Sequence, residues 1–91
     1  MNKVLVEQNP SPMKLEVLGV DDWPVAREAI GVIEREYPQT ETSYILEGSG
    51  EIQFSDDESV SFTAGDLITV MPETSCIWNI TEAIERHYSK G

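Results

Sequence analysis

The chain contains one cysteine and one histidine among its 91 residues, and these two side chains limit the chemistry that it can perform. Any imidazole chemistry must use His87, so a metal centre built from several histidines is excluded. Cys76 could act as a nucleophile or a soft metal ligand, but a lone cysteine in an apolar strand is more often an inert core residue. Ser43, Ser75 and Thr69 have no histidine and acid partners in a recognisable arrangement, so serine-hydrolase chemistry is unsupported.

Acidic residues dominate the composition, with 17 Asp and Glu against six Lys and Arg and a formal net charge of −11. A field of this sign repels phosphate backbones and anionic lipids, so nucleic acids and membranes are poor partners. A single cysteine cannot form an intrachain disulfide, and charge and proline interrupt the N-terminus before an apolar signal region could form. No apolar run approaches the ~20 residues of a membrane-spanning helix. We therefore expect a cytoplasmic protein whose partner is a small molecule.

Short segments rich in β-branched and aromatic residues recur after Pro38, with turn residues between them. The six segments are Thr42–Glu47, Glu51–Ser55, Ser59–Phe62, Leu67–Met71, Cys76–Ile80 and Ala83–Tyr88. Gly48 and Gly50 predict a hairpin turn between the first two segments, and Thr81-Glu82 predicts a turn between the last two. Evenly spaced short strands of this kind predict an all-β sandwich or barrel.

The first half of the chain carries weaker signals than the second. Residues 1–20 are expected to form a lead-in with edge strands at 3–7 and 14–18, because both pieces alternate apolar residues and prolines separate them. A chain of this length has room for one core, so residues 21–91 are expected to form the barrel of a single domain.

Two elements are expected at the start of the barrel. Asp22 is a plausible N-cap and Pro24 suits a first helical turn, so we predict one short helical turn at about 24–29. Residues 32–37 alternate in the manner of a strand, which we predict there.

Four pieces of the sequence resemble a known family. Tyr44–Ile52 resembles the first cupin motif, and Thr63–Val70 resembles the opening of the second. Cys76–Tyr88 is similar to the ending of the small cupins grouped with the (S)-ureidoglycine aminohydrolase cupin domain, and Trp23-Pro24 matches the N-terminal region of that group. The resemblance covers roughly residues 20–90. It implies an RmlC-like cupin fold, a double-stranded β-helix or jelly-roll barrel, whose interior can hold one small ligand.

The resemblance also implies where a metal would lie. Metal-binding cupins supply two histidines and a glutamate from the first motif and another histidine from the second. Alignment places Glu41 at the motif glutamate, Arg35 and Tyr37 at the first two histidines, and Cys76 at the third. Only one of the four positions keeps a residue of the family type. We therefore expect no cofactor, and a divalent metal held by Glu41, Cys76 and His87 stays an alternative.

Strand parity predicts what lines the barrel mouth instead. The predicted lining and ligand-binding residues are Arg35, Tyr37, Glu41, Cys76 and Trp78. Arg35 is expected to form an ion pair with Glu41 in the volume that a metal would take. A small polar or carboxylate-bearing compound could bind the same groups.

Three functions are compatible with these residues. The first is a binding module that holds a small polar metabolite without the usual multi-histidine metal centre. The second, implied by the resemblance, is a metal-assisted hydrolase or isomerase that would use Glu41, Cys76 and His87, with Glu47 or another chain as a further ligand. The third is a structural β-barrel acting as a homodimer, in which the segments at 3–7 and 14–18 supply the pairing edges.

Overall fold

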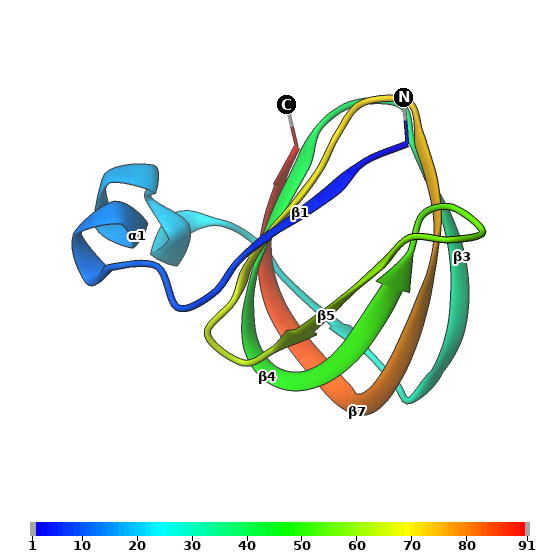
Figure 1. Ribbon diagram of the computed structural model, residues 1–91. Helices are drawn as coiled ribbons and strands as arrows, with labels where there is room; N and C mark the ends of the chain where they lie inside the picture. Colours follow the sequence, from blue (N-terminus) through cyan, green and yellow to red (C-terminus); the bar gives the residue numbers. More distant parts are fainter. Residues whose placement is uncertain (1, 91) are drawn as a thin grey trace.

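Two long strands form the frame of the barrel. The computed structural model describes residues 2–90, in which β4 (Glu41–Gln53) and β7 (Thr74–Lys90) pair antiparallel along most of their length. Figure 1 shows both strands curving round the same side of the molecule. Because all strand pairs are antiparallel, the chain repeatedly turns back on itself, and the all-β prediction is confirmed.

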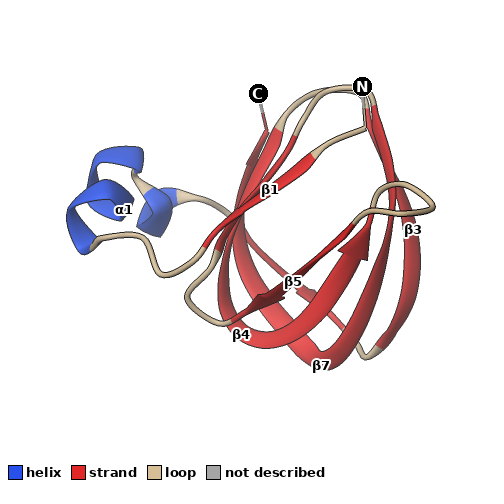
Figure 2. Cartoon of the chain, viewed as in Figure 1, coloured by secondary structure: helices blue, strands red, loops and turns tan. Residues whose placement is uncertain are grey.

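Five shorter strands complete the sheet. They are β1 (Val4–Glu7), β2 (Val25–Glu28), β3 (Gly31–Tyr37), β5 (Ser59–Thr63) and β6 (Leu67–Val70). The strand order is β1-β6-β4-β7-β2, with β3 also paired to β7 and β5 also paired to β4 (Figure 2). The predicted strands at 3–7 and 32–37 are confirmed by β1 and β3. No helix among residues 2–90 is long and apolar enough to cross a membrane.

Alternate residues of the strands point inward and make the core. Ile45 and Ile52 of β4, Ile68 of β6, and Trp78 and Ile80 of β7 are at most 1% exposed. The Trp78 ring packs edge-on against the Phe62 ring, with 5.4 Å between their centroids. Burial of these apolar side chains is the main source of stability in a domain of this size.

The hairpin predicted at Gly48 and Gly50 is wrong, because both glycines lie inside β4. The register between β4 and β7 shifts there, and Gly48 has a φ of 93°. A Cβ atom at Gly48 would lie 2.3 Å from the Ala83 carbonyl oxygen, and one at Gly50 would lie 2.5 Å from that of Asn79. The glycines therefore allow an irregular strand to bend closely across β7. The turn predicted at Thr81-Glu82 is wrong as well, since β7 continues through it.

The strand predicted at 14–18 is wrong, because this segment forms the helix α1 (Pro12–Leu18). The Ser11 hydroxyl caps the helix by accepting a hydrogen bond from the Lys14 amide at 3.2 Å, and Gly19 ends it in the left-handed conformation. A Ser-Pro start and a glycine stop are recognised helix signals that outweighed the short alternation. None of the residues of α1 is buried, and Figure 1 shows the helix standing away from the barrel.

A short α-helix is therefore present, but not at the predicted position. Residues 24–29 contain β2 instead of a helical turn, and the 3-10 helix η1 (Val20–Asp22) precedes them. β2 pairs antiparallel with β7, from Val25 opposite His87 to Glu28 opposite Ile84. This long-range pairing overrides the local helix signal of Pro24.

Candidate functional site

A buried arginine lies at the centre of the polar side chains inside the barrel. Arg86 of β7 is 3% exposed. Its Nε and Nη2 atoms donate to the two carboxylate oxygens of Glu28, each at 3.2 Å. Its Nη1 atom donates to Oε2 of Glu41 at 3.3 Å and to the hydroxyl of Ser43 at 2.8 Å. Three strands, β2, β4 and β7, thus converge on one guanidinium group, and the bidentate pairing with Glu28 is the geometry that arginine favours.

The surroundings of Arg86 keep it charged. Burial alone would lower the pKa of the guanidinium, but the hydrogen bonds and negative charge of Glu28, with the charge of Glu41, more than offset this and raise it. The guanidinium carbon lies 5.6 Å from the ring centroid of Trp78 and 5.2 Å from that of Tyr88. These aromatic faces add cation–π attraction on the sides that the carboxylates leave open.

The predicted ion pair between Arg35 and Glu41 is wrong. Arg35 of β3 instead donates from Nη2 to Oε1 of Glu28, and Glu41 pairs with Arg86. The reason is that β2 was not expected, so its inward-facing Glu28 could not be placed beside Arg35. The Arg35 side chain is 29% exposed and its guanidinium carbon lies 5.8 Å from the centroid of Trp78. Arg35 is therefore the more accessible of the two interior arginines.

Tyr37 presents a donor that nothing satisfies among residues 2–90. The residue is 6% exposed, and its buried hydroxyl has no hydrogen-bond partner there. Burial and the negative charge of Glu41 raise the pKa of this phenol to about 12, although Arg35 lowers it in part. The hydroxyl therefore stays protonated and can donate a hydrogen bond at any physiological pH.

Cys76 sits opposite Arg35 in the register of β3 and β7, and it is buried. Burial raises the pKa of the Cys76 thiol. The nearby indole N–H of Trp78 offsets part of this rise in the thiol pKa, although that N–H has no hydrogen-bond partner among residues 2–90. A thiol of raised pKa is a weak nucleophile and a poor metal ligand at neutral pH.

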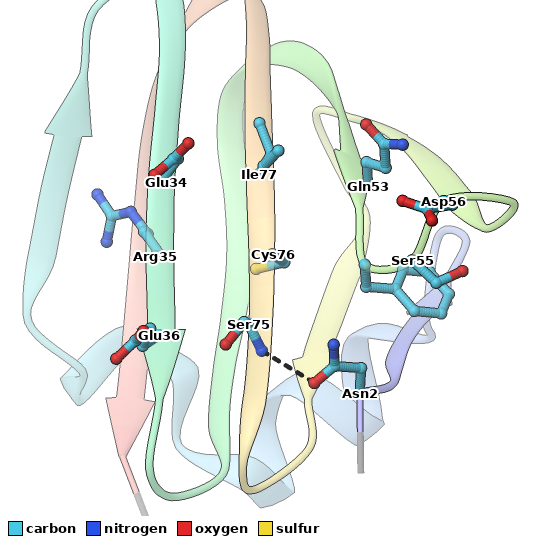
Figure 3. A pocket seen from close by; sticks show the side chains of 11 residues that line it. Asn2, Glu34, Arg35, Glu36, Gln53, Ser55, Asp56, Ser75, Cys76 and Ile77 are labelled. Atoms are coloured by element: carbon cyan, nitrogen blue, oxygen red, sulfur yellow. Dashed lines mark hydrogen bonds between the residues drawn. The ribbon is translucent and has the colours of Figure 1, made fainter.

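Two cavities open at this end of the barrel, and Arg35 lines both. The smaller, of about 210 Å³, is lined by Arg35, Glu36, Tyr37, Pro38, Gln39, Glu41 and Lys90. The larger, of about 490 Å³, is bounded by β3, by the start of β7 and by residues 53–56, as Figure 3 shows. Three predicted ligand-binding residues line the smaller cavity, whereas Arg35 and Cys76 line the larger. Trp78 is 1% exposed and lines neither, so it forms the floor beneath the arginines.

His87 is not part of this cluster. Its Nδ1 atom lies 2.9 Å from the backbone oxygen of Trp23, and strand alternation places its side chain on the face of β7 opposite to Arg86. The structure therefore does not bring His87 together with Glu41 and Cys76. Within residues 2–90 no three side chains of His, Cys, Asp or Glu are grouped so that they could hold a metal.

The residues that sequence reasoning missed are Arg86, Glu28, Ser43 and Tyr88. The sequence contains one signal for two of these residues. Arg86 and Tyr88 alternate in β7 in phase with the buried Cys76 and Trp78, which indicates that their side chains point to the same side of the strand. Strand alternation carried through the expected turn at residues 81–82 would have placed Arg86 inside. Glu28 carried no such signal, since its segment was expected to be helical.

An antiparallel barrel whose interior holds an apolar core and a cluster of polar side chains around Arg86 is the architecture of a cupin domain. The chain belongs to the EutQ-like cupin domain family, whose model matches residues 15–88. A DUF861 family protein from Thermotoga maritima has a similar structure, with a TM-score of 0.92, 32% sequence identity and alignment over 98% of this chain and 100% of that one.

Two EutQ structures share the fold at lower identity. The putative ethanolamine utilization protein Q of Salmonella typhimurium is 15% identical, with a TM-score of 0.65 over 72% of this chain and 53% of that one. EutQ of Clostridium difficile is also 15% identical, with a TM-score of 0.67 over 96% of this chain and 66% of that one. This chain therefore spans only part of the length of those proteins. No curated protein matches the sequence.

The side chains present do not fit the cation that metal-binding cupins hold. Glu41 is engaged by Arg86, and the Cys76 thiol has a raised pKa. A guanidinium bonded to the aligned carboxylate places a fixed positive charge where a second cation would be repelled. The arrangement can instead hold hydrogen-bonding groups of a small molecule.

Proposed function

We propose that this protein is a binding module that holds a small polar or carboxylate-bearing compound in the mouth of its barrel, without a multi-histidine metal centre. The observation that carries the proposal is the buried hydroxyl of Tyr37, which has no hydrogen-bond partner among residues 2–90 and belongs to a residue that lines the same cavity as Arg35 and Glu41. An unsatisfied buried donor is unfavourable by about 1–3 kcal/mol, so such a group is usually kept for a role other than stability.

The two interior arginines have different roles in this proposal. Arg86 directs its donors to Glu28, Glu41 and Ser43, and its function is to hold the strands and orient these groups. Within the described part of the chain, Arg35 makes one side-chain hydrogen bond, from Nη2, and its side chain is partly exposed where it lines the cavities. Most of its five N–H donors are therefore available to a ligand.

A thermal-shift screen with small polar and carboxylate-bearing metabolites tests the proposal. A ligand should raise the melting temperature of the wild-type protein, and Arg35→Ala should abolish that rise. Arg27→Ala is the matched control, because Arg27 lies on β2 with its side chain 78% exposed and, among residues 2–90, forms its ion pair with Glu85 alone. Absence of any stabilising compound, or stabilisation that survives Arg35→Ala, would contradict the binding site.

The metal-assisted hydrolase or isomerase of the ureidoglycine type makes a different prediction. It requires metal in protein that was purified without added metal, and elemental analysis measures this directly. Stoichiometric Mn, Fe, Ni or Zn that disappears in Glu41→Ala or Cys76→Ala would replace the binding-module proposal with the metalloenzyme.

We also propose that the protein forms a homodimer through its N-terminal region. The support is the apolar surface of this region, where Met13 and Val17 of α1 are 74% and 81% exposed and Leu5 of β1 is 47% exposed. A helix of seven residues is marginal in water without packing against another surface. A second copy of the chain could supply that surface.

A further inference from the structure

The charges that line the smaller cavity balance one another. Arg35 and Lys90 contribute two positive charges, and Glu36 and Glu41 contribute two negative charges. The long-range field of the chain is negative, with a formal net charge of −11. A free anion entering this cavity would therefore meet no excess of positive charge.

The buried ions behind the cavity do not change this balance. Arg86 pairs with both oxygens of Glu28, so the two charges cancel beside the cavity. An added carboxylate would bring a third negative charge against the two positive charges of the lining. Beside the buried side chains of Tyr37 and Glu41 such an uncompensated charge is unfavourable. An uncharged ligand avoids this penalty.

The hydrogen-bonding groups favour a ligand with both an acceptor and a donor. The Tyr37 hydroxyl and the remaining N–H groups of Arg35 can donate to one carbonyl oxygen. Arg86 engages Oε2 of Glu41, which leaves Oε1 to accept an N–H group. A primary amide presents a carbonyl oxygen and N–H donors about 2.3 Å apart on one planar carbon, and it carries no charge.

We propose that the ligand of this cavity is a small uncharged amide whose oxygen is bound by Tyr37 and Arg35 and whose N–H is bound by Glu41. The inference rests on the proposed function and narrows it, because it selects an amide over a free carboxylate. The cavity volume of about 210 Å³ equals roughly seven water molecules, at ~30 Å³ each, and sets the size of the compound.

Acetamide and acetate are the probes, since they have the same number of heavy atoms and differ in charge. Each is titrated to ~50 mM at constant ionic strength into isotopically labelled protein, because ligands of this size bind weakly. We expect acetamide to shift the backbone amide resonances of Tyr37, Gln39 and Glu41 in a saturable way. Acetate should bind at least about tenfold more weakly, since it brings an uncompensated charge.

Tyr37→Phe removes only the hydroxyl and should weaken acetamide binding roughly five- to tenfold, the effect of one lost hydrogen bond. Tyr44→Phe is the matched control, because Tyr44 lies on the outward parity of β4 and lines neither barrel-mouth cavity. It should bind acetamide as the wild type does.

The outcomes separate this inference from the proposed function. If acetate shifted the same resonances and bound more tightly than acetamide, the inference that the ligand is an amide would be overturned. The protein would then be a module that binds carboxylates. Unchanged acetamide binding in Tyr37→Phe would overturn the role of the hydroxyl. If neither probe bound in a saturable way, the inference that the ligand is an amide would be overturned. If the metabolite screen also found no stabilising compound, the proposal of a binding module would be overturned as well.

Discussion

Replacing Arg86 with methionine removes the cation that neutralises two buried carboxylates while keeping a side chain of similar length. The side chains of Glu28 and Glu41 are only 10% and 7% exposed, so water cannot take over the role of the guanidinium. Removing one partner of a buried ion pair is unfavourable by about 3–5 kcal/mol. We expect Arg86→Met to lower the free energy of unfolding by that amount.

The size of this loss is large for a small domain. Domains of this kind have a free energy of unfolding of roughly 5–15 kcal/mol, so Arg86→Met should remove about a fifth of it or more. Arg27→Met is the control, because its pair with Glu85, at 2.6 Å, lies on the surface with the Arg27 side chain 78% exposed. An exposed pair contributes less than about 1 kcal/mol. Urea unfolding followed by circular dichroism measures both variants.

A triple variant separates stranded charge from lost packing. Arg86→Met combined with Glu28→Gln and Glu41→Gln leaves no buried carboxylate without a cation. Arg35 loses Glu28 in this variant, but its side chain is 29% exposed and can be hydrated, so we expect the triple variant to recover most of the stability lost by Arg86→Met alone. The explanation would be refuted if Arg86→Met lost no more stability than Arg27→Met. It would also be refuted if the triple variant were no more stable than Arg86→Met.

Three further predictions use other features of the structure. Because burial raises the pKa of Tyr37 from 10 to about 12, the protonated phenol favours the folded state, and up to about 2.7 kcal/mol of stability should be lost as pH rises from 10 through 12. Tyr37→Phe should lack that loss in urea unfolding, and a parallel decline in both proteins would contradict it. The Cys76 thiol should react with an aromatic disulfide reagent at pH 8 at least about tenfold more slowly in the folded protein than in urea, and fast labelling of the folded protein would contradict its raised pKa. Met13→Glu together with Val17→Glu should shift the mass in solution from dimer to monomer, and an unchanged dimer would place the interface outside α1.

The strand pattern of the second half could be predicted because alternation is a local property. Strand parity predicts Glu41, Cys76 and Trp78 on the inner side of the barrel, and all three are buried. Alternation does not show where a strand ends, since glycines mark both hairpin turns and strand irregularities. The expected hairpin at residues 48–50 is therefore a bend inside β4, where Gly48 approaches the backbone of Ala83.

The candidate site could be predicted only in part, because its ion pairs join distant positions. Strand parity and the family alignment identified Arg35, Tyr37 and Glu41 as side chains of the barrel mouth. The partners of these groups depend on which strands become neighbours. Glu28 and Arg86 are 58 residues apart, and only the pairing of β2 with β7 brings them into contact. That pairing was hidden by a helix signal at Pro24.

The position of Arg86 changes the chemistry that this barrel can offer. In metal-binding cupins the carboxylate at the position of Glu41 helps to hold a cation, and such a cation can polarise a bound oxygen. Here the same carboxylate is bonded to a permanently charged guanidinium whose donors are directed to Glu28, Glu41 and Ser43. Arg86 therefore supplies positive charge to the fold but little to a ligand. Under the proposed function, recognition of a ligand would fall to Arg35 and Tyr37, which can donate hydrogen bonds, and such groups suit selective binding better than activation of a substrate.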